Sequence, residues 1–489
     1  MKESIIISEE VKQHFSARAT LAALGVKVRE KKLFEPITEK VKIAQKTIRY
    51  TPTEKLMDAE IAILSGAHGM VEINKRVRAD RGLQAAFGRN GCAEQSVVQD
   101  TLDACSKENV SQMQAALDQI YRQHSQGYGH DYHKSWQLLD VDMTGRPCGR
   151  KAVFASKGYF AKQRNRRGRQ EGYLIATNYE EIVSKQLFDG KTQLTKALRP
   201  LVETAEKTLG LDQDRAKRQL TILRIDSGGG SVDEVNWVLK RGYQLHGKDY
   251  SGTRAQNLAE SVMEWFDDPG CPERQVGWVT VEADLYCRPV KRIAVRCRKN
   301  NGQWGIGVLI STLSSQEVLK LTDQPIPKAS DPRAVLLAYV HFYDQRGGGV
   351  ETEIKEDKQG LGTSKRNKKR FEAQYMLTIL EALAHNILVW ARHWLAHCCP
   401  RVAQFGMLRL VRDAFHMNGL ILLDPCSGLE NRPQSGRPFC RRIAYRFFCS
   451  IRPGADCHYF GRNLGNYISL LLSSVLYQEG VQQTELTDK

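Results

Sequence analysis

"QLTILRIDSGGGSVDEVNWVLKRGYQLHGKDYSG" (residues 219–252) contains the order of elements that decides the fold. It begins with a nearly continuous apolar run that ends in Asp226, as a buried central strand would. Ser231 and Glu234 have the spacing of a capping box, and Gly242 ends the helix that they begin. The residues after Gly242 return to a strand pattern. A strand, a helix and a second strand in this order predict an α/β core with parallel pairing.

The segments around this core extend the pattern. Residues 136–144, 151–160 and 171–178 are predicted strands. A long helical stretch is expected at about 179–210. Residues 277–313 are rich in strand-forming side chains and interrupt the alternation of strands and helices, so we expect an inserted antiparallel sheet there.

The ends of the chain differ from the core. Residues 1–130 show apolar residues at helical spacing, separated by small-residue turns, which fits a helix-turn-helix-like DNA module and equally any small helical bundle. The apolar run 375–395 contains Glu381 and Arg392, so we expect a buried or amphipathic helix and no membrane span. The N-terminus lacks the order of a signal peptide. Residues beyond 420 have weak periodicity and many Arg, Pro and Cys, and their role stays open.

Composition points to a polyanionic partner. The chain has 489 residues, which predicts several domains, and 72 Lys and Arg against 55 Asp and Glu give a net charge of +17. Such an excess favours nucleic acid, although a basic protein without such a partner has the same composition. Cations gather at 157–169 and 365–370. The twelve cysteines include no C-x-x-C pair, which argues against a zinc ribbon or a thioredoxin-type site.

Carboxylates stand where the strands of the core end. Burying a charge without a partner is costly, so Asp140 and Asp142 in one strand and Asp226 in another need a reason. Ligands of open α/β sheets gather beyond the carboxyl ends of strands, where Asp142 and Asp226 fall. The alternative for Asp226 is a helix N-cap or turn residue, which is weakened because Ser231 is already a plausible cap.

A third acid follows in "YDQRGGGVETEIKEDK" (343–358). Three glycines are expected to stop a helix, so a new helix begins near Val350. Glu351, Lys355 and Lys358 then lie on one face, at positions i, i+4 and i+7. This arrangement suits a metal ligand beside phosphate contacts, and it suits a surface helix with ordinary ion pairs as well.

Taken together, these residues resemble bacterial insertion-sequence transposases of the DDE type. The resemblance rests on a strand with Asp-x-Thr (Asp142), a strand ending in Asp (Asp226), and a Tyr-Arg-Glu-Lys signature. That signature has two residues between Tyr and Arg, three between Arg and Glu, and six between Glu and Lys. Tyr343 and Arg346 have the first gap, and Glu351 has the last gap to Lys358. The middle interval here has four residues, which we interpret as one extra glycine.

The resemblance implies a ribonuclease-H-like catalytic core with a β-rich insertion. It implies Asp142, Asp226 and Glu351 as catalytic residues and ligands of Mg²⁺, with Mn²⁺ as a substitute, and it favours Asp142 over Asp140. The residues expected to contact DNA are Tyr343, Arg346, Lys355 and Lys358. The expected reaction is water-dependent strand cleavage, followed by strand transfer from the freed 3′-hydroxyl.

The implied domains are a helical DNA-binding region (1–130), a core in two parts (131–252 and 331–400), the insertion (253–330) and an unassigned C-terminal region (401–489). The expected partner is double-stranded DNA, as terminal inverted repeats and as target, bound by a homodimer. The expected place is the bacterial cytoplasm, at the nucleoid. Two alternatives remain: a catalytically inactive DNA-binding protein derived from a transposase, and a ribonuclease-H-like nuclease without strand transfer.

Overall fold

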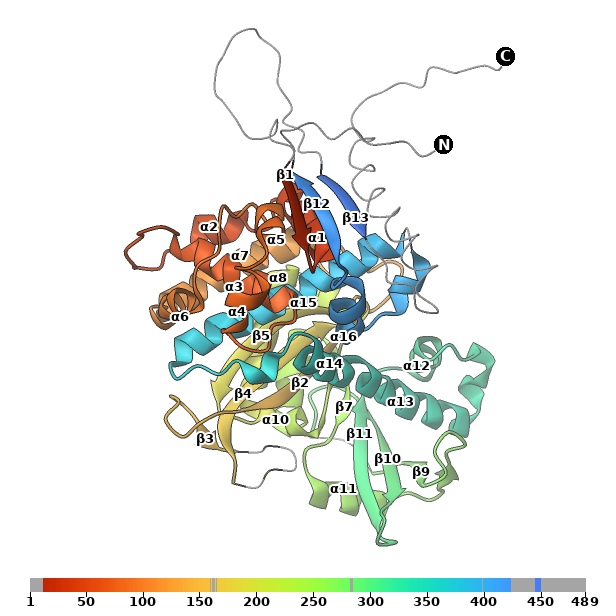
Figure 1. Ribbon diagram of the computed structural model, residues 1–489. Helices are drawn as coiled ribbons and strands as arrows, with labels where there is room; N and C mark the ends of the chain where they lie inside the picture. Colours follow the sequence, from red (N-terminus) through yellow and green to blue (C-terminus); the bar gives the residue numbers. More distant parts are fainter. Residues whose placement is uncertain are drawn as a thin grey trace, which may run out of the picture. The chain divides into compact units, whose positions relative to one another are not determined.

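The computed structural model describes residues 12–423 and 445–449, except for residues 159, 161, 162, 164, 282–284 and 398 (Figure 1). Most of the cysteine-rich C-terminal region therefore lies outside the described residues. The chain divides into two compact units. Unit 1 comprises Met1–Cys105, Asp357–Arg366 and Ile387–Lys489, and unit 2 comprises Ser106–Glu356 and Asn367–Asn386.

Unit 1 contains short helices and a three-stranded sheet. The prediction that the N-terminal region is mostly helical is confirmed for its described residues, apart from β1. Thr51 begins α3 with a reciprocal capping box, in which its side chain accepts from the backbone N–H of Glu54. The main elements are β1 (Lys12–Ser16), α1 (Ala19–Glu30), α2 (Glu35–Lys40), α3 (Pro52–Leu64), α4 (Glu72–Arg76), α5 (Arg81–Ala86), α6 (Gln95–Asp103), β12 (Gly419–Leu423) and β13 (Tyr445–Cys449).

Unit 2 is built on a mixed sheet whose core strands run in the order β5-β4-β2-β6-β7. The strands β6 and β7 are parallel to β2, whereas β4 is antiparallel to both β2 and β5. The predicted strand, helix and strand at 219–252 are confirmed as β6, α10 and β7. The bounds are β2 (Gln137–Pro147), β4 (Arg167–Ala176), β5 (Glu181–Asp189), β6 (Thr221–Ile225), α10 (Val232–Arg241) and β7 (Gln244–Lys248).

The strands predicted at 277–313 continue this same sheet. Strand β11 (Trp304–Ser311) pairs antiparallel with β7, and β10 (Lys291–Arg298) pairs antiparallel with β11. Strands β9 (Arg274–Trp278) and β8 (Phe266–Asp267) follow at the edge (Figure 1). The expected antiparallel strands are present, but they extend the core sheet and do not form a separate one.

Helices cover both faces of the core strands. A side chain at Gly172 would meet Leu201 of α8 (Leu194–Leu209), so α8 lies against that face. The next residue, Tyr173, packs with Ala382 of α15 (Phe371–Ala396). Because neighbouring strand residues point to opposite faces, α8 and α15 cover opposite sides of the sheet.

Two secondary-structure predictions were wrong. Residues 179–210 do not form one long helix, because β5 occupies the first half and α8 follows it. The buried Lys185 of β5 lies 3.3 Å from the carboxylate of Glu381, a partner from α15 that local sequence does not reveal. Among the described residues of the predicted strand 151–160, only β3 (Ser156–Lys157) is paired as a strand.

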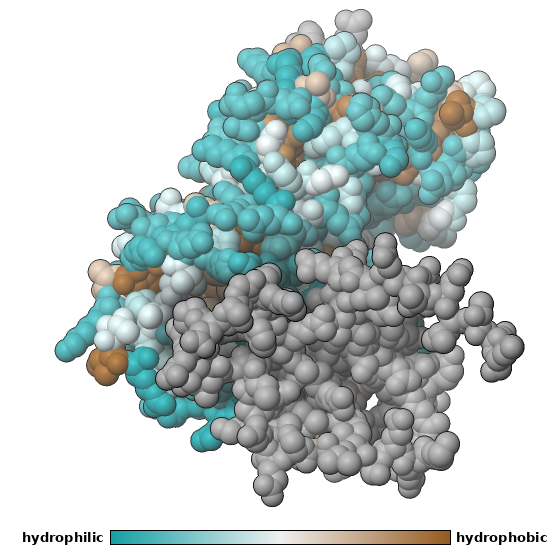
Figure 2. Space-filling view, turned by 90° about the horizontal axis from the view of Figure 1, so that it is seen from above, coloured by the Kyte–Doolittle hydropathy of each residue, from teal (hydrophilic) through white to brown (hydrophobic). Residues whose placement is uncertain are grey.

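The surface of the described residues is ordinary. Among them, no helix is both long enough and apolar enough to cross a bilayer. The apolar run 375–395 lies in α15 and is largely buried, as the sequence predicted. On the face shown in Figure 2, hydrophilic side chains predominate and hydrophobic ones form small separate patches.

A buried ion pair joins the two central strands to helix α13 (Pro332–Arg346). Arg224 of β6 donates to both carboxylate oxygens of Asp140 in β2, at 2.6 and 2.7 Å. Its third nitrogen donates to the carbonyl oxygen of Phe342 in α13 at 3.0 Å. Both charged side chains are almost fully buried. The pair therefore joins α13 to β2 and to the carboxyl end of β6.

We expect Arg224→Met to lower the free energy of unfolding by about 3–5 kcal/mol, because it leaves the buried charge of Asp140 without a partner. The double variant Asp140→Leu, Arg224→Met should recover part of that loss, since it removes both charges. Thermal unfolding followed by calorimetry and circular dichroism would test this. Equal destabilisation by the single and double variants would show that packing, and not the ion pair, matters here.

Candidate active site

The two aspartates that the sequence placed at strand ends lie on or directly after the neighbouring strands β2 and β6, but only Asp226 is at an end. Strand β2 continues five residues beyond Asp142, to Pro147, because it goes on pairing with β4. Asp142 lies in β2, two residues beyond Asp140, and its side chain is 17% exposed. Asp226 follows β6 directly. It also accepts a hydrogen bond from the backbone N–H of Gly228 at 2.9 Å, which caps a short 3₁₀ turn. The turn role considered for Asp226 is thus present, while Ser231 caps the longer helix α10.

The triple glycine interrupts the helix, as predicted. Helix α13 runs to Arg346, and the chain kinks within the following segment, Gly347–Glu351, before α14 (Thr352–Gly360). Gly349 departs from helical geometry, with φ −89° and ψ −105°, so two helices meet at this kink. The extra residue of the signature lies in this glycine-rich kink.

This geometry separates Glu351 from its neighbour Val350. Val350 is fully buried and packs with Tyr173 and Ile354 in an apolar cluster. The side chain of Glu351 is 61% exposed and lies 3.5 Å from Arg346. Val350, which stands at the strict signature spacing, is therefore part of the core, and Glu351 faces the acidic group.

Arg346 links the acids. One of its terminal nitrogens lies 3.5 Å from Asp142 and donates to the carbonyl oxygen of Val141 at 2.5 Å. The other terminal nitrogen lies 3.5 Å from Glu351. The residue is only 2% exposed. Burial alone lowers the pKa of Arg346, but Asp142 and Asp140 raise it overall, so the guanidinium stays charged.

The acids and Tyr343 influence each other's ionisation. Burial raises the pKa of Asp142 to about 6; Arg346 opposes this rise, and the negative charges of Asp226 and Glu351 add to it. Burial and the same three carboxylates raise the pKa of Tyr343 to about 12. The structure therefore brings together five residues that the sequence selected.

The carboxylates are of the type that binds a hard divalent cation, since carboxylate oxygens are the ligands that Mg²⁺ prefers. Among the described residues, however, no three Asp, Glu, His or Cys side chains lie close enough together to hold a metal ion. The guanidinium of Arg346 lies 3.5 Å from both Asp142 and Glu351. Burial is the main cause of the raised pKa of Asp142, and the negative charges of Asp226 and Glu351 add to it.

The alternative first acid, Asp140, does not belong to this group of open carboxylates. It is fully buried, and both of its oxygens accept from Arg224. Sequence reasoning missed Arg224, although a cation inside the apolar run "TILRI" was the available signal.

The remaining residues of the 343–358 stretch take different positions. Lys355 is exposed on α14, and Lys358 belongs to unit 1. Glu353 is 12% exposed and its carboxylate lies 4.0 Å from His385 of α15. It thus lies beside α15 and not in the group around Arg346.

Several cations of the two basic stretches are structural. Arg169 is fully buried and donates to the carbonyl oxygens of Val153, Lys368 and Lys369. Lys368 itself is 6% exposed. The buried guanidinium of Arg169 therefore holds loops of the protein together.

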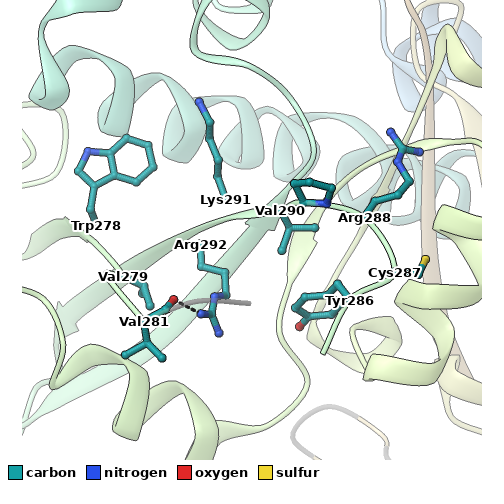
Figure 3. Close-up of a pocket in the computed structure, with 10 residues that line it drawn as sticks. Trp278, Val279, Val281, Tyr286, Cys287, Arg288, Val290, Lys291 and Arg292 are labelled. Atoms are coloured by element: carbon teal, nitrogen blue, oxygen red, sulfur yellow. Dashed lines mark hydrogen bonds between the residues drawn. The ribbon is translucent and has the colours of Figure 1, made fainter. Parts of the chain in front are cut away.

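A separate hollow of about 770 Å³ lies on the β-rich part of the sheet (Figure 3). Its lining includes Trp278 and Tyr286 together with Arg288, Lys291 and Arg292. Trp278 packs edge-on against Tyr339 of α13, with ring centroids 5.9 Å apart. One side of Trp278 is therefore anchored in the core.

No family model matches this sequence, and no curated protein matches it either. Among solved structures, the chain is similar to one described as a cryo-EM structure of a piggyBac transposase synaptic complex with hairpin DNA. The similarity covers 83% of this chain and 82% of that chain, with 11% sequence identity and a TM-score of 0.38. The likeness is too distant to identify the function of this chain.

Asp142 should make the protein less stable at neutral pH than at acid pH when no divalent cation is present. Its pKa rises from 3.8 to about 6 on folding, so the folded protein binds this proton more tightly than the unfolded chain. The stabilisation from that proton is complete below pH 4 and is lost as pH rises through 6. We therefore expect Asp142→Asn to stabilise the protein by about 1–3 kcal/mol at pH 7.5 and by much less at pH 4.5.

Thermal unfolding in EDTA at both pH values would measure this difference. The exposed Asp323 offers a matched control, and Asp323→Asn should change the melting temperature little at either pH. A loss of stability for Asp142→Asn at pH 7.5 would contradict the view that this carboxylate is crowded.

Proposed function

We propose that this protein is a DNA transposase of the DDE type, with a ribonuclease-H-like core that cuts element ends and joins them to a target. One observation carries the proposal. Asp142, Asp226 and Glu351 come from three distant segments, and each influences the same group of charges around Arg346. The core strand order, with three antiparallel strands followed by two strands parallel to the first, supports a ribonuclease-H-like core.

The three carboxylates would hold Mg²⁺ or Mn²⁺ beside the middle of β2 and the carboxyl end of β6. When bound, such ions activate an attacking oxygen and stabilise the leaving oxygen of a phosphodiester. Asp142 lies in β2 and Asp226 directly after β6, which gives them a rigid base. Glu351 lies just beyond the kink at Gly349, and Arg346 lies 3.5 Å from both Glu351 and Asp142.

The chain's other residues would bind and orient DNA. Arg346 stands where the signature has its phosphate-binding arginine, and its fork can grip a phosphate with two parallel hydrogen bonds. Tyr343, one turn earlier, would position the strand near the cut. The net charge of +17 suits a polyanionic substrate. The helices of the N-terminal region would bind the terminal repeats, and a homodimer would bring two ends together.

Arg346→Ala should reduce cleavage by about 100-fold or more, because this side chain contacts two of the proposed ligands and occupies the signature position. Lys355→Ala should stay within a few-fold of the parent, since Lys355 is exposed and matches no signature position. Nicking of end DNA at fixed salt would measure both. Equal losses would count against the role given to Arg346.

Glu351→Gln should abolish Mg²⁺-dependent nicking and strand transfer while DNA binding and folding remain largely intact. Glutamine keeps the size and helix propensity of glutamate and removes only the charge that would neutralise the cation. The assay uses full-length protein, the DNA that flanks its own gene, and Mg²⁺, with binding followed in parallel by electrophoretic mobility.

Glu353→Gln is the matched control, two residues away and turned towards His385. It should leave activity within a few-fold of the parent, with melting temperature checked because this side chain is largely buried. Nicking without joining would favour a nuclease, and binding without nicking by the parent protein would favour an inactive derivative. If Glu353 proves to be the sensitive position, the assignment of Glu351 is wrong.

A further inference from the structure

We propose that Arg274, at the start of β9, is a positioning residue that fixes the end of α13 from which Tyr343 and Arg346 reach the acidic group. This inference rests on the proposed function, because the reaction that would be affected is the proposed DNA cleavage. It assigns a role to a residue of the β-rich strands that lies outside the group of carboxylates.

Arg274 joins two acids from different elements. One of its terminal nitrogens lies 2.6 Å from a carboxylate oxygen of Asp268 and 2.6 Å from a carboxylate oxygen of Asp344. Its Nε donates to Asp268 at 2.7 Å. Asp268 lies in the turn between β8 and β9, whereas Asp344 lies in the last turn of α13. The side chain of Arg274 is 13% exposed, so this link is largely shielded from water.

The turn that carries Asp268 is itself well fixed. The fully buried carboxylate of Asp268 accepts from the backbone N–H of Gly270 at 2.8 Å, and it lies 3.2 Å from a ring nitrogen of His341 in α13. Burial alone raises the pKa of Asp268, but these hydrogen bonds and Arg274 lower it overall. The carboxylate is thus held in its charged form, and the C-terminal half of α13 is linked to this hairpin at two points, by His341 to Asp268 and by Asp344 to Arg274.

The position of Asp344 explains why this link matters for the site. It directly follows Tyr343 and precedes Arg346 by two residues, and the glycines of the kinked segment come next. A side chain added at Gly347 or Gly348 would meet no atom within 4 Å, so packing does not hold this part of the chain. The bond from Arg274 is therefore an anchor placed just before a stretch that has no side chains to fix it.

Helix α13 has a comparable link at its other end. Arg333, in the first turn of α13, donates to the backbone carbonyl oxygen of Asp267 at 3.2 Å. It ties the helix to β8 of the same hairpin, about three and a half helical turns before Arg346. Substitution of Arg333 thus separates the general effect of loosening α13 from the effect of loosening the end that carries the site.

Asp344→Asn is the sharpest test, because it weakens the link and leaves the buried pair of Arg274 and Asp268 intact. We expect kcat for nicking of end DNA to fall about 10-fold, as a reacting group displaced by a fraction of an ångström would cause. The KM for DNA should stay within about two-fold and the melting temperature within about 2 °C, since Asp344 is 45% exposed. Arg333→Met should leave kcat unchanged within about two-fold.

Hydrogen exchange provides a readout that does not depend on activity. In Asp344→Asn, amides of residues 343–351 should exchange faster than in the parent, and in Arg333→Met they should not. The kcat of Arg274→Lys should lie between the kcat of the parent and that of Asp344→Asn. Lysine keeps the positive charge, but it lacks the planar fork with which Arg274 reaches both acids.

The outcomes separate this proposal from the proposed function. If the parent protein never nicks DNA, the proposed function fails, and the exchange rates at 343–351 still decide whether Arg274 fixes this segment. Unchanged kcat and unchanged exchange in Asp344→Asn would overturn the positioning role. Equal losses of kcat in Asp344→Asn and Arg333→Met would overturn it too, because the link would then be merely structural.

Discussion

The buried pair of Asp140 and Arg224 is the constraint on which the site depends. Taking both charges out of water costs several kcal/mol, and the cost is offset only because three hydrogen bonds satisfy the guanidinium, two to Asp140 and one to the carbonyl oxygen of Phe342. These bonds connect β2, β6 and α13. A single side chain thus joins the strands beside Asp142 and Asp226 to the helix that leads to the segment with Glu351.

The same pair sets the positions of the proposed acids. Asp140 and Arg224 are register partners in the parallel ladder of β2 and β6. Asp142 and Asp226 each follow two residues later in their chains, and side chains two residues apart along a strand point to the same side. The buried pair Asp140 and Arg224 therefore lies two residues before the proposed pair Asp142 and Asp226 along each strand. Glu351 comes from the segment that follows α13, just beyond the kink at Gly349.

The sequence was sufficient wherever local pattern decides structure. The strand that ends at Asp226 and the helix between Ser231 and Gly242 follow from periodicity and capping, and the structure contains both. It was insufficient where distant partners decide. Lys185 is buried in a strand because Glu381 of α15 meets it, and Arg169 is buried because loop carbonyls accept its bonds. No local pattern reveals such partners.

The balance of charge around Arg346 connects stability with the proposed chemistry. The three carboxylates have a formal charge of −3 and Arg346 contributes +1, so the group has a formal charge of −2. Burial is the main cause of the raised pKa of Asp142, and the charges of Asp226 and Glu351 add to it, so the ionised form of Asp142 opposes folding at neutral pH. In the proposed function a divalent cation would offset this cost, which connects the burial of Asp142 with the proposed chemistry.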